Sequence, residues 1–238
     1  MLTVDFNKLN IKPGDRILDA GCGTGRHLCE AYRDRGIHVV GIDMNWEDLR
    51  KAKYTLFSME HSTGGSWMTS KADVTRLPFK DEAFDVVICS EVLEHIPDNR
   101  AAVSELVRVL KAGKNMVVSV PRYLPERICW ALSRDYHNEP GGHIRIYKKR
   151  QIQSMMEAAG TKCWRINYRH SLHVPYWWLK CMVGHKRENS SIVNGYKAFL
   201  EWDIMKKPLF TRMLDKMLNP LIGKSVVLYF KKDVVHGT

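Results

Sequence analysis

The run ILDAGCGTG, residues 17–25, decides the fold, because it places a short apolar strand, a tight glycine turn and a helix start in succession. The missing side chains at Gly21 and Gly23 let the backbone approach a ligand closely. A GxGxxG dinucleotide fingerprint would need glycine where Arg26 stands, and Asp19 at the strand end would repel a pyrophosphate. The turn therefore favours a cationic ligand, such as a sulfonium that carries an amino group.

Acidic side chains also end the next two predicted strands. Asp43 closes the strand HVVGID about 20 residues after the glycines, where a carboxylate accepts hydrogen bonds from both hydroxyls of a ribose. Asp73 closes the third strand, where it can meet the exocyclic amine of adenine while Val74 lines the ring. Each acid also has a structural interpretation as a helix or turn cap. Acids at three successive strand ends together indicate one adenosyl site.

Short β-branched runs alternate with segments of helical period, which is typical of a parallel sheet covered by helices. One helix is expected over residues 97–110, with Pro97 in its first turn and Gly113 beyond its end, and another over residues 152–159. The predicted strands are residues 16–20, 37–43, 67–73, 84–90, 115–120, 162–168 and 225–230.

Four blocks of sequence carry a family resemblance: LDAGCGTGRH (18–27), VVGID (39–43), ADVTRLPF (72–79) and FDVVICSEVLEHIPD (84–98). In this order they resemble the class I S-adenosylmethionine-dependent methyltransferases, especially the ubiquinone and menaquinone biosynthesis type (methyltransferase type 11). The resemblance covers about residues 16–120. It implies a Rossmann-like α/β fold with seven strands in the order 3-2-1-4-5-7-6, the last strand antiparallel, and helices on both faces of the sheet.

The same resemblance implies S-adenosylmethionine as methyl donor and S-adenosylhomocysteine as by-product. Two departures from the family affect local loop geometry: LKAGK at 110–114 replaces the usual LKPGG, and Trp46 replaces a small residue after the ribose acid. The residues that the resemblance assigns to the cofactor are Asp19, Gly21 and Gly23 for the methionine portion, Asp43 with Met44 for the ribose, Asp73 with Val74 for the adenine, and Ser90 below the sulfonium.

Positive charge divides the chain in two. Residues 1–120 contain 16 lysines and arginines against 17 acids, whereas residues 121–238 contain 21 against 9 and five of the seven tryptophans. We expect residues 1–120 to form the cofactor-binding core and residues 121–238 to complete the sheet, all within one structural domain. Two insertions, residues 121–147 and 171–223, are expected to form a basic, aromatic substrate cap. The basic half suits an anionic partner, whether a phosphorylated substrate, nucleic acid or an acidic membrane surface, or it is a solvated face.

Methyl transfer is an in-line displacement at a carbon that the sulfonium already activates, so the protein mainly supplies alignment and no metal is expected. A base helps when the acceptor is a hydroxyl or an acidic carbon. The candidates are His95, which follows the fourth strand, and His143 and Tyr136 in the first insertion. Histidine is favoured because imidazole exchanges protons near neutral pH. The alternatives are that His95 bonds a loop backbone and that His143 only anchors the insertion.

Two stretches of the second insertion are apolar with a basic edge: residues 172–183, which contain Trp177 and Trp178, and residues 212–218. Such segments can roof a pocket for a hydrophobic substrate, lie in a membrane interface, or simply pack on the sheet. The six cysteines are scattered singly and predict reduced thiols. With no leader or membrane span, we expect a cytoplasmic protein, and peripheral contact of the cap with the inner face of a membrane is one alternative.

The leading hypothesis is methyl transfer to an oxygen or carbon of a small hydrophobic or anionic acceptor, with a quinone- or lipid-like precursor as the first expectation. RNA methylation is a second hypothesis, weakened because no RNA-binding module and no NPPY tetrad is present. A non-catalytic cofactor-binding scaffold is the third. The acceptor and the oligomeric state are left open by the sequence.

Overall fold

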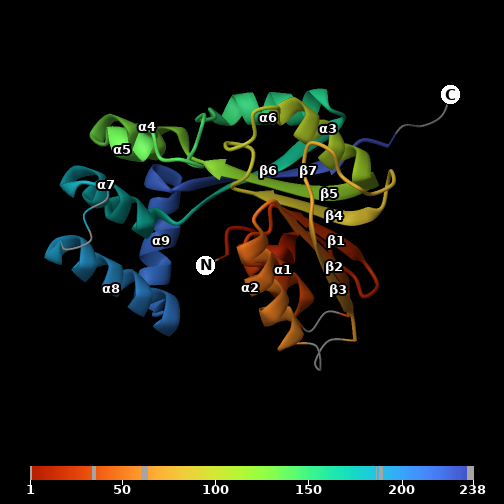
Figure 1. The fold of residues 1–238 in the computed structure, drawn as a ribbon, viewed down its shortest axis with the longest axis horizontal. Coiled ribbons are helices and arrows are strands. Elements are labelled where there is room, and N and C mark those ends of the chain that lie inside the picture. The colour runs from red at the N-terminus through yellow and green to blue at the C-terminus, as the bar shows by residue number, and fades with distance from the viewer. Residues whose placement is uncertain (1, 34–35, 60–63, 186, 188–189, 235–238) are drawn as a thin grey trace.

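The computed structural model describes residues 2–33, 36–59, 64–185, 187 and 190–234. Within these residues seven strands form one sheet, in the order β3-β2-β1-β4-β5-β7-β6 (Figure 1). Strand β7 runs antiparallel to both β5 and β6, and the other pairs are parallel, which confirms the predicted order and orientation. The strands are β1 (Arg16–Ala20), β2 (His38–Asp43), β3 (Ser66–Lys71), β4 (Phe84–Ser90), β5 (Leu110–Pro121), β6 (Thr161–Arg169) and β7 (Ser225–Lys232).

Helices cover both faces of the sheet, as predicted. Helices α1 and α2 lie on one face and α3 and α6 on the other, while α7, α8 and α9 stand together at one end of the molecule (Figure 1). The helices are α1 (Arg26–Tyr32), α2 (Trp46–Phe57), α3 (Asn99–Val109), α4 (Tyr123–Leu132), α5 (Arg134–His137), α6 (Lys149–Ala158), α7 (Val174–Val183), α8 (Ser191–Lys206) and α9 (Leu209–Ile222), with 3-10 turns η1 (Phe6–Lys8) and η3 (Ser171–His173).

The central strands are apolar on both sides because both of their faces are buried. Along β1, Ile17 packs with Leu28 of α1, whereas its neighbour Leu18 packs with Leu106 of α3 on the opposite face. All four side chains are completely buried. Successive residues of a strand point to opposite faces, so this alternation places one apolar layer on each side of the sheet.

Helix α3 begins two residues later than predicted. The side chain of Asp98 accepts a hydrogen bond from the backbone N–H of Ala101 at 3.0 Å, so Asp98 is the N-cap. Pro97 therefore precedes the helix and does not belong to its first turn. Aspartate is a preferred N-cap because its carboxylate satisfies an amide that has no partner within the helix.

Two strands differ from their predicted bounds. Strand β5 begins at Leu110, which pairs with Phe84 of β4, and its register shifts before the rest of the pairing continues. Gly113, predicted to follow the preceding helix, lies within β5 at a φ of +70°. Strand β3 ends at Lys71, so Asp73 lies in the loop beyond the strand. The other predicted elements overlap observed ones, with slightly shifted ends.

The two insertions provide helices beyond the carboxyl end of β5. The first contains α4 and α5, and the second contains η3, α7, α8 and α9. Helix α4 packs on α7, and α7 packs on α8, so the two insertions contact each other as a helical cap. None of the described helices combines the length and the apolar character that crossing a bilayer requires.

Gly41 on β2 permits close packing between the sheet and α1. A Cβ atom there would lie 2.4 Å from Leu28 Cδ2 and 3.0 Å from Cys22 Sγ. We expect Gly41→Ala to lower the free energy of unfolding by about 1–3 kcal/mol, because Leu28 is buried and cannot move aside freely. Gly195→Ala in α8 is the control: nothing lies within 4 Å of its added Cβ, so it should raise stability by up to about 1 kcal/mol. Equal urea midpoints for the two variants would contradict this packing.

Candidate active site

A cavity of about 410 Å³ lies at the carboxyl ends of β1 and β2, between the glycine turn and the loops that follow β3 and β4. Its volume is in the range of small-molecule sites. Glu91 and His95 line it from the loop after β4. Six of the eight residues predicted to contact a cofactor also line it: Gly21, Gly23, Asp43, Met44, Asp73 and Val74.

Asp43 ties the glycine turn to the start of α2. Its Oδ2 atom accepts a hydrogen bond from the backbone N–H of Gly23 at 2.8 Å, and its Oδ1 atom accepts one from the N–H of Asn45 at 2.8 Å. Asn45 in turn caps α2 by accepting from Glu47 N–H at 2.9 Å. The carboxylate therefore orders the loop, and each oxygen keeps lone-pair capacity for a further donor such as a ribose hydroxyl.

The turn itself requires glycine at position 21. Gly21 has a φ of +76°, and a Cβ atom there would lie 2.2 Å from Val92 Cγ2. Gly23 also has a positive φ, of +50°, but a Cβ atom there would meet nothing within 4 Å. Position 23 thus faces open space, which fits the close approach of a ligand to the backbone.

Asp19 is buried beneath this turn and does not line the cavity. Its side chain is 1% exposed, and its Oδ2 atom has no hydrogen-bond partner within the described residues. Burial raises the pKa of Asp19 to about 7, although the positive charge of Arg26 opposes the shift. The charge of Arg26 offsets only part of the cost of burying this carboxylate, because burial still raises its pKa. The site therefore fits a ligand that brings a cation close to this group, as the amino group of S-adenosylmethionine would.

The remaining predicted cofactor residues are placed as follows. Asp73 is exposed, and its Oδ1 atom accepts from Thr75 N–H at 2.8 Å. Ser90 is 6% exposed, and its hydroxyl lies 2.8 Å from that of Ser119, so it sits in the sheet and not in the cavity wall. The assignment of Ser90 to the sulfonium stays a prediction, as do the individual roles of the other cofactor residues.

The three predicted catalytic residues come together in a second cluster beside the cavity. The rings of His95 and His143 are 4.9 Å apart between centroids, and those of His143 and Tyr136 are 6.5 Å apart. His95 Nδ1 donates to the carbonyl of Gly142 at 3.0 Å, which leaves Nε2 as the acceptor in the neutral ring. The loop after β4 and the first insertion therefore meet at these two imidazoles.

Glu126 of α4 links two members of this cluster. Its Oε1 atom lies 2.6 Å from His143 Nδ1, and its Oε2 atom accepts from the hydroxyl of Tyr136 at 3.3 Å. Glu126 is 3% exposed. Burial and the charge of Glu126 raise the pKa of Tyr136, so the phenol stays protonated at neutral pH. In this arrangement Tyr136 holds the carboxylate, and the carboxylate orients His143.

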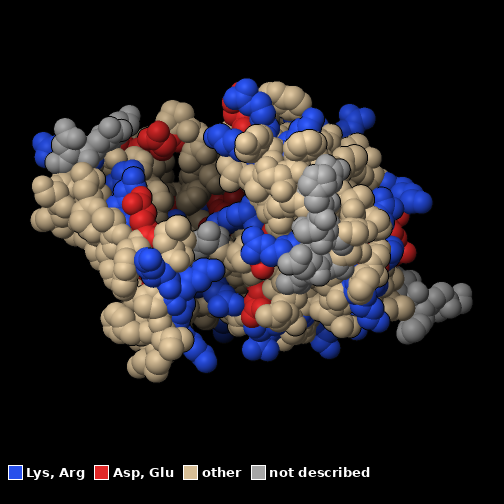
Figure 2. Space-filling model, turned by 90° about the horizontal axis from the view of Figure 1, so that it is seen from below, with Lys and Arg blue, Asp and Glu red and all other residues tan. Residues whose placement is uncertain are grey.

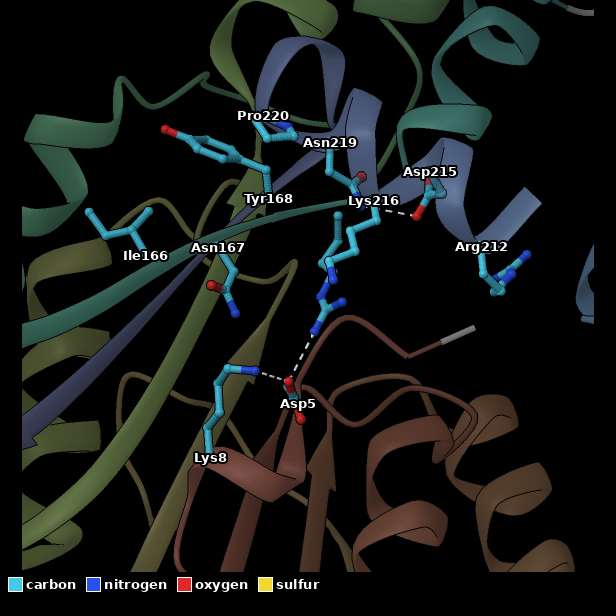
Figure 3. Close-up of a pocket in the computed structure, with 11 residues that line it drawn as sticks. Asp5, Lys8, Ile166, Asn167, Tyr168, Arg212, Asp215, Lys216, Asn219 and Pro220 are labelled. Carbon is cyan, nitrogen blue, oxygen red and sulfur yellow. Dashed lines mark hydrogen bonds and ion pairs between the residues drawn. The ribbon is translucent and has the colours of Figure 1, made fainter. Parts of the chain in front are cut away.

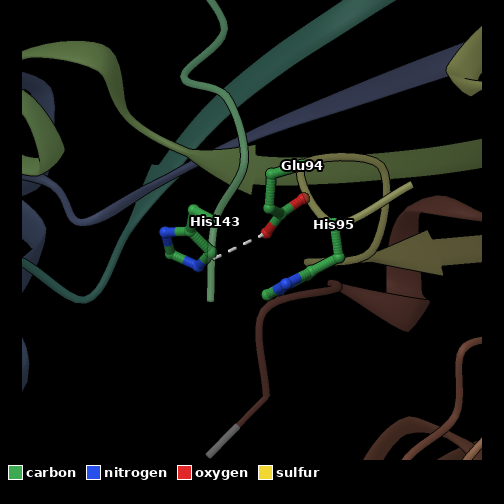
Figure 4. Close-up of side chains that lie close together, drawn as sticks. All are labelled: Glu94, His95 and His143. Carbon is green, nitrogen blue, oxygen red and sulfur yellow. Dashed lines mark ion pairs between the residues drawn. The ribbon is translucent and has the colours of Figure 1, made fainter. Parts of the chain in front are cut away.

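Glu94 is a second buried carboxyl group in the cluster (Figure 4). It is fully buried, neither oxygen has a hydrogen-bond partner within the described residues, and Oε1 lies 4.0 Å from His143 Nε2. Burial, and next the charges of Glu91 and Glu126, raise the pKa of Glu94 well above its usual range. Burial therefore favours the protonated form of Glu94 relative to an exposed glutamate.

Three of these side chains also have the geometry of a metal site. Ligand atoms of Glu94, His95 and His143 all lie within 4.8 Å of one another (Figure 4). The sequence prediction that no metal takes part stays a prediction. Imidazole nitrogens with a carboxylate oxygen suit a first-row divalent cation such as Zn²⁺.

An aromatic surface from the cap adjoins the cluster. Tyr136 contacts Trp177 at 5.8 Å and His185 at 5.0 Å between ring centroids, and the ammonium of Lys224 lies 4.5 Å from the centre of the Trp177 ring. Sequence reasoning gave no role to Glu94, Glu126, His185 or Lys224. Glu94 lies inside the EVLEH block, but no sequence signal connects Glu126 to a histidine 17 residues later.

The sequence matches a model of a methyltransferase family, described as a methyltransferase domain, over residues 3–166. The chain belongs to the class I S-adenosylmethionine-dependent methyltransferases. A curated relative of this methyltransferase is a ubiquinone biosynthesis O-methyltransferase of Hahella chejuensis, 38% identical over 121 residues, which are 50% of this chain and 49% of that protein. Another is the sterol 24-C-methyltransferase erg6 of Schizosaccharomyces pombe, 28% identical over 66% of this chain and 38% of that one.

Solved structures agree with the fold of the methyltransferase. The YcgJ protein of Bacillus subtilis is 18% identical and superimposes with a TM-score of 0.64 over 96% of both chains. At this identity the likeness shows the fold alone. The methyltransferase spans about half the length of the first curated relatives or less, and the names of these relatives give different acceptors.

Proposed function

We propose that this methyltransferase transfers the methyl group of S-adenosylmethionine to a hydroxyl oxygen of a small, largely aromatic acceptor. The observation that carries the proposal is the pairing of buried Glu126 with partly buried His143 beside the donor cavity. A carboxylate that accepts from one imidazole nitrogen fixes the tautomer and stabilises the ring when it takes a proton on the other nitrogen. Such a base is needed for a hydroxyl acceptor.

The donor supplies a methyl carbon that is already bonded to a positively charged sulfur. Asp43 and the glycine turn would hold the ribose and the methionine portion, and buried Asp19 would be the counter-charge for the amino group. His143 takes the hydroxyl proton while a carbon–oxygen bond forms and the carbon–sulfur bond breaks. The electron pair of that bond remains on sulfur, so S-adenosylhomocysteine leaves neutral at sulfur and the proton stays on His143 until solvent removes it.

The surroundings of the base support the choice of acceptor class. Tyr136, Trp177 and His185 offer aromatic surface, and the ammonium of Lys224 lies 4.5 Å from the centre of the Trp177 ring. An apolar ring that bears a hydroxyl and an anionic substituent matches these groups. Quinone- or lipid-like precursors of this kind should be assayed first, and the ubiquinone biosynthesis relatives support that order.

Activity on defined acceptors tests the proposal. Purified protein should be incubated with S-adenosylmethionine and a panel of catechols, hydroxybenzoates and quinols, with detection of S-adenosylhomocysteine and of the methylated product by mass. We expect turnover on at least one phenolic acceptor and none on a matched acceptor whose hydroxyl is already methylated. Turnover on tRNA with steep salt dependence would instead establish the RNA hypothesis. Binding of S-adenosylhomocysteine without turnover on any acceptor would favour the scaffold hypothesis.

The buried carboxyl of Asp19 makes cofactor binding pH-dependent. Because its pKa is raised to about 7, lowering the pH below that value protonates the group and removes the counter-charge for the ligand's amino group. We expect the affinity for S-adenosylhomocysteine to fall by up to about tenfold for each pH unit below 7 and to level off above it. Calorimetry across this range measures the effect. Asp19→Asn should bind weakly with little pH dependence, and a flat profile for the wild type would contradict the assignment.

A further inference from the structure

Helix α9 buries polar residues and exposes most of its large apolar side chains. Among its most buried residues are Thr211 and Asn219, and Asp215 accepts from the hydroxyl of Ser171 at 2.7 Å. Successive residues of a helix are about 100° apart, so positions spaced by four lie along one side. The side of α9 opposite Thr211, Asp215 and Asn219 carries five large apolar side chains. Each of them is at least 66% exposed: Leu209, Phe210, Met213, Met217 and Leu221.

This apolar stripe of α9 continues into the corner between α8 and α9. Met205 is 79% exposed and Trp202 is 46% exposed at the end of α8. Scattered exposed apolar residues are ordinary, but a contiguous row of this size on a soluble surface marks an interaction site. Because the stripe residues are largely exposed, they contribute little to packing α9 on the described part of the protein.

Positive charge borders the stripe. Lys206 and Lys207 are exposed at the corner between the helices, and Arg212 and Lys216 lie along one edge of α9. Figure 2 shows lysine and arginine gathered in a band beside a broad uncharged surface, at the end of the molecule that carries the cap helices. The surface therefore combines an apolar row with a cationic margin.

The cationic margin extends into a cavity of about 570 Å³ between η1, β6 and α9 (Figure 3). Arg212 and Lys216 line it together with Lys8 and Arg169. Of these cations, Lys8 and Arg169 share the carboxylate of Asp5, and Arg212 pairs with Asp203. Asp5 and Asp215 line the same cavity, so the positive charge that borders the stripe is mainly that of Lys206, Lys207 and Lys216.

We propose that the α9 stripe and the α8–α9 corner dock on an anionic phospholipid bilayer. The apolar row would enter the boundary between headgroups and acyl chains, as the apolar face of an interfacial helix does, and the bordering lysines and arginines would meet lipid phosphates. The proposal is independent of the acceptor assigned above, since it concerns a surface outside the donor cavity.

Charge argues against a second copy of this chain as the occupant. A symmetric dimer through α9 would bring the same patch of both subunits together. Lys206, Lys207 and Lys216 of one copy would then face the same cations of the other, and the chain carries a net charge of +11. An anionic bilayer offers apolar contact and the opposite charge at once.

Vesicle sedimentation with the full chain tests the proposal. We expect binding to phosphatidylcholine vesicles that contain phosphatidylglycerol, weaker binding to phosphatidylcholine alone, and loss of the difference at high salt. The double variant Phe210→Ser, Met213→Ser should bind the anionic vesicles about tenfold or more weakly, because two large apolar side chains no longer enter the interface. Lys206→Gln with Lys216→Gln should weaken binding by about tenfold.

Matched controls exist on α2, away from this surface. Phe57 is 65% exposed and Phe210 is 66% exposed, so Phe57→Ser removes the same side chain from an equally exposed position and should leave vesicle binding unchanged. All variants should retain S-adenosylhomocysteine binding, which verifies their fold. The proposal would be overturned if Phe57→Ser lost as much vesicle binding as the Phe210→Ser, Met213→Ser double variant. It would also be overturned if the wild type did not bind anionic vesicles. A wild-type dimer in light scattering that Phe210→Ser dissociates would overturn it as well, because the stripe would then be an interface between copies.

Discussion

Asp43→Ala is expected to weaken S-adenosylhomocysteine binding by two to four orders of magnitude. The carboxylate would provide two hydrogen bonds to the ribose, and a hydrogen bond to a charged group contributes about 1.5–3 kcal/mol, so the loss is about 3–6 kcal/mol. In the wild type the backbone N–H groups of Gly23 and Asn45 donate hydrogen bonds to Asp43, and the variant leaves both without this acceptor. Titration calorimetry on both proteins measures the difference.

Asp81→Ala is the matched control for this variant. Asp81 is 76% exposed and forms a surface ion pair with Arg108 at 2.7 Å, so its loss should leave cofactor affinity unchanged. Circular dichroism and the melting temperature verify that Asp43→Ala is folded. If folded Asp43→Ala binds as the wild type does, the donor does not lie at the end of β2. If folded wild type does not bind at all, the proposed activity is wrong.

His143→Gln is expected to lower kcat on a hydroxyl acceptor by about 10²–10⁴-fold, the usual contribution of a general base. Its affinity for S-adenosylhomocysteine should stay the same, because His143 is not among the residues that line the donor cavity. Glu126→Gln should lower kcat less, by about 10–100-fold, because it only orients the imidazole at 2.6 Å. The pH profile of kcat separates this positioning role from a structural one, since it should change in both variants.

His137→Gln is the control for the base. His137 is exposed and packs on Trp130 at 4.1 Å between ring centroids, outside the Glu126 network. This variant should keep its activity. Retained kcat in His143→Gln together with a large loss in His95→Gln would move the base to His95, whose Nε2 is also positioned to accept a proton.

The donor side of the molecule could be predicted from sequence because its residues follow strand ends directly. Once ILDAGCGTG forms a strand and turn, Asp19, Gly21 and Gly23 are placed by local geometry, and parallel pairing brings Asp43 beside them. The order of the strands came from the resemblance and is confirmed. The ends of several elements differed, as where Asp98 caps α3, and Asp19 and Ser90, which were predicted to contact the cofactor, lie outside the cavity wall.

The acceptor side could not be predicted because it depends on contacts between distant insertions. Glu126 reaches His143 only through the packing of α4 beside the loop that follows α5, and no spacing rule encodes that contact. For helix α9 the sequence showed the pattern but not its orientation. Its amphipathic pattern was visible in residues 212–218, but a pattern does not tell which side faces the protein, and here buried Asn219 and Thr211 determine it.

The hydrogen bonds that Asp43 makes to Gly23 and Asn45 have a consequence for product inhibition. A loop that is already ordered costs little entropy to occupy, so the spent cofactor should find the same preformed surface as the donor. The two molecules share the ribose and the methionine portion that this loop would contact, so we expect them to compete on nearly equal terms. The working rate in a cell would then follow the ratio of S-adenosylmethionine to S-adenosylhomocysteine more closely than the amount of either.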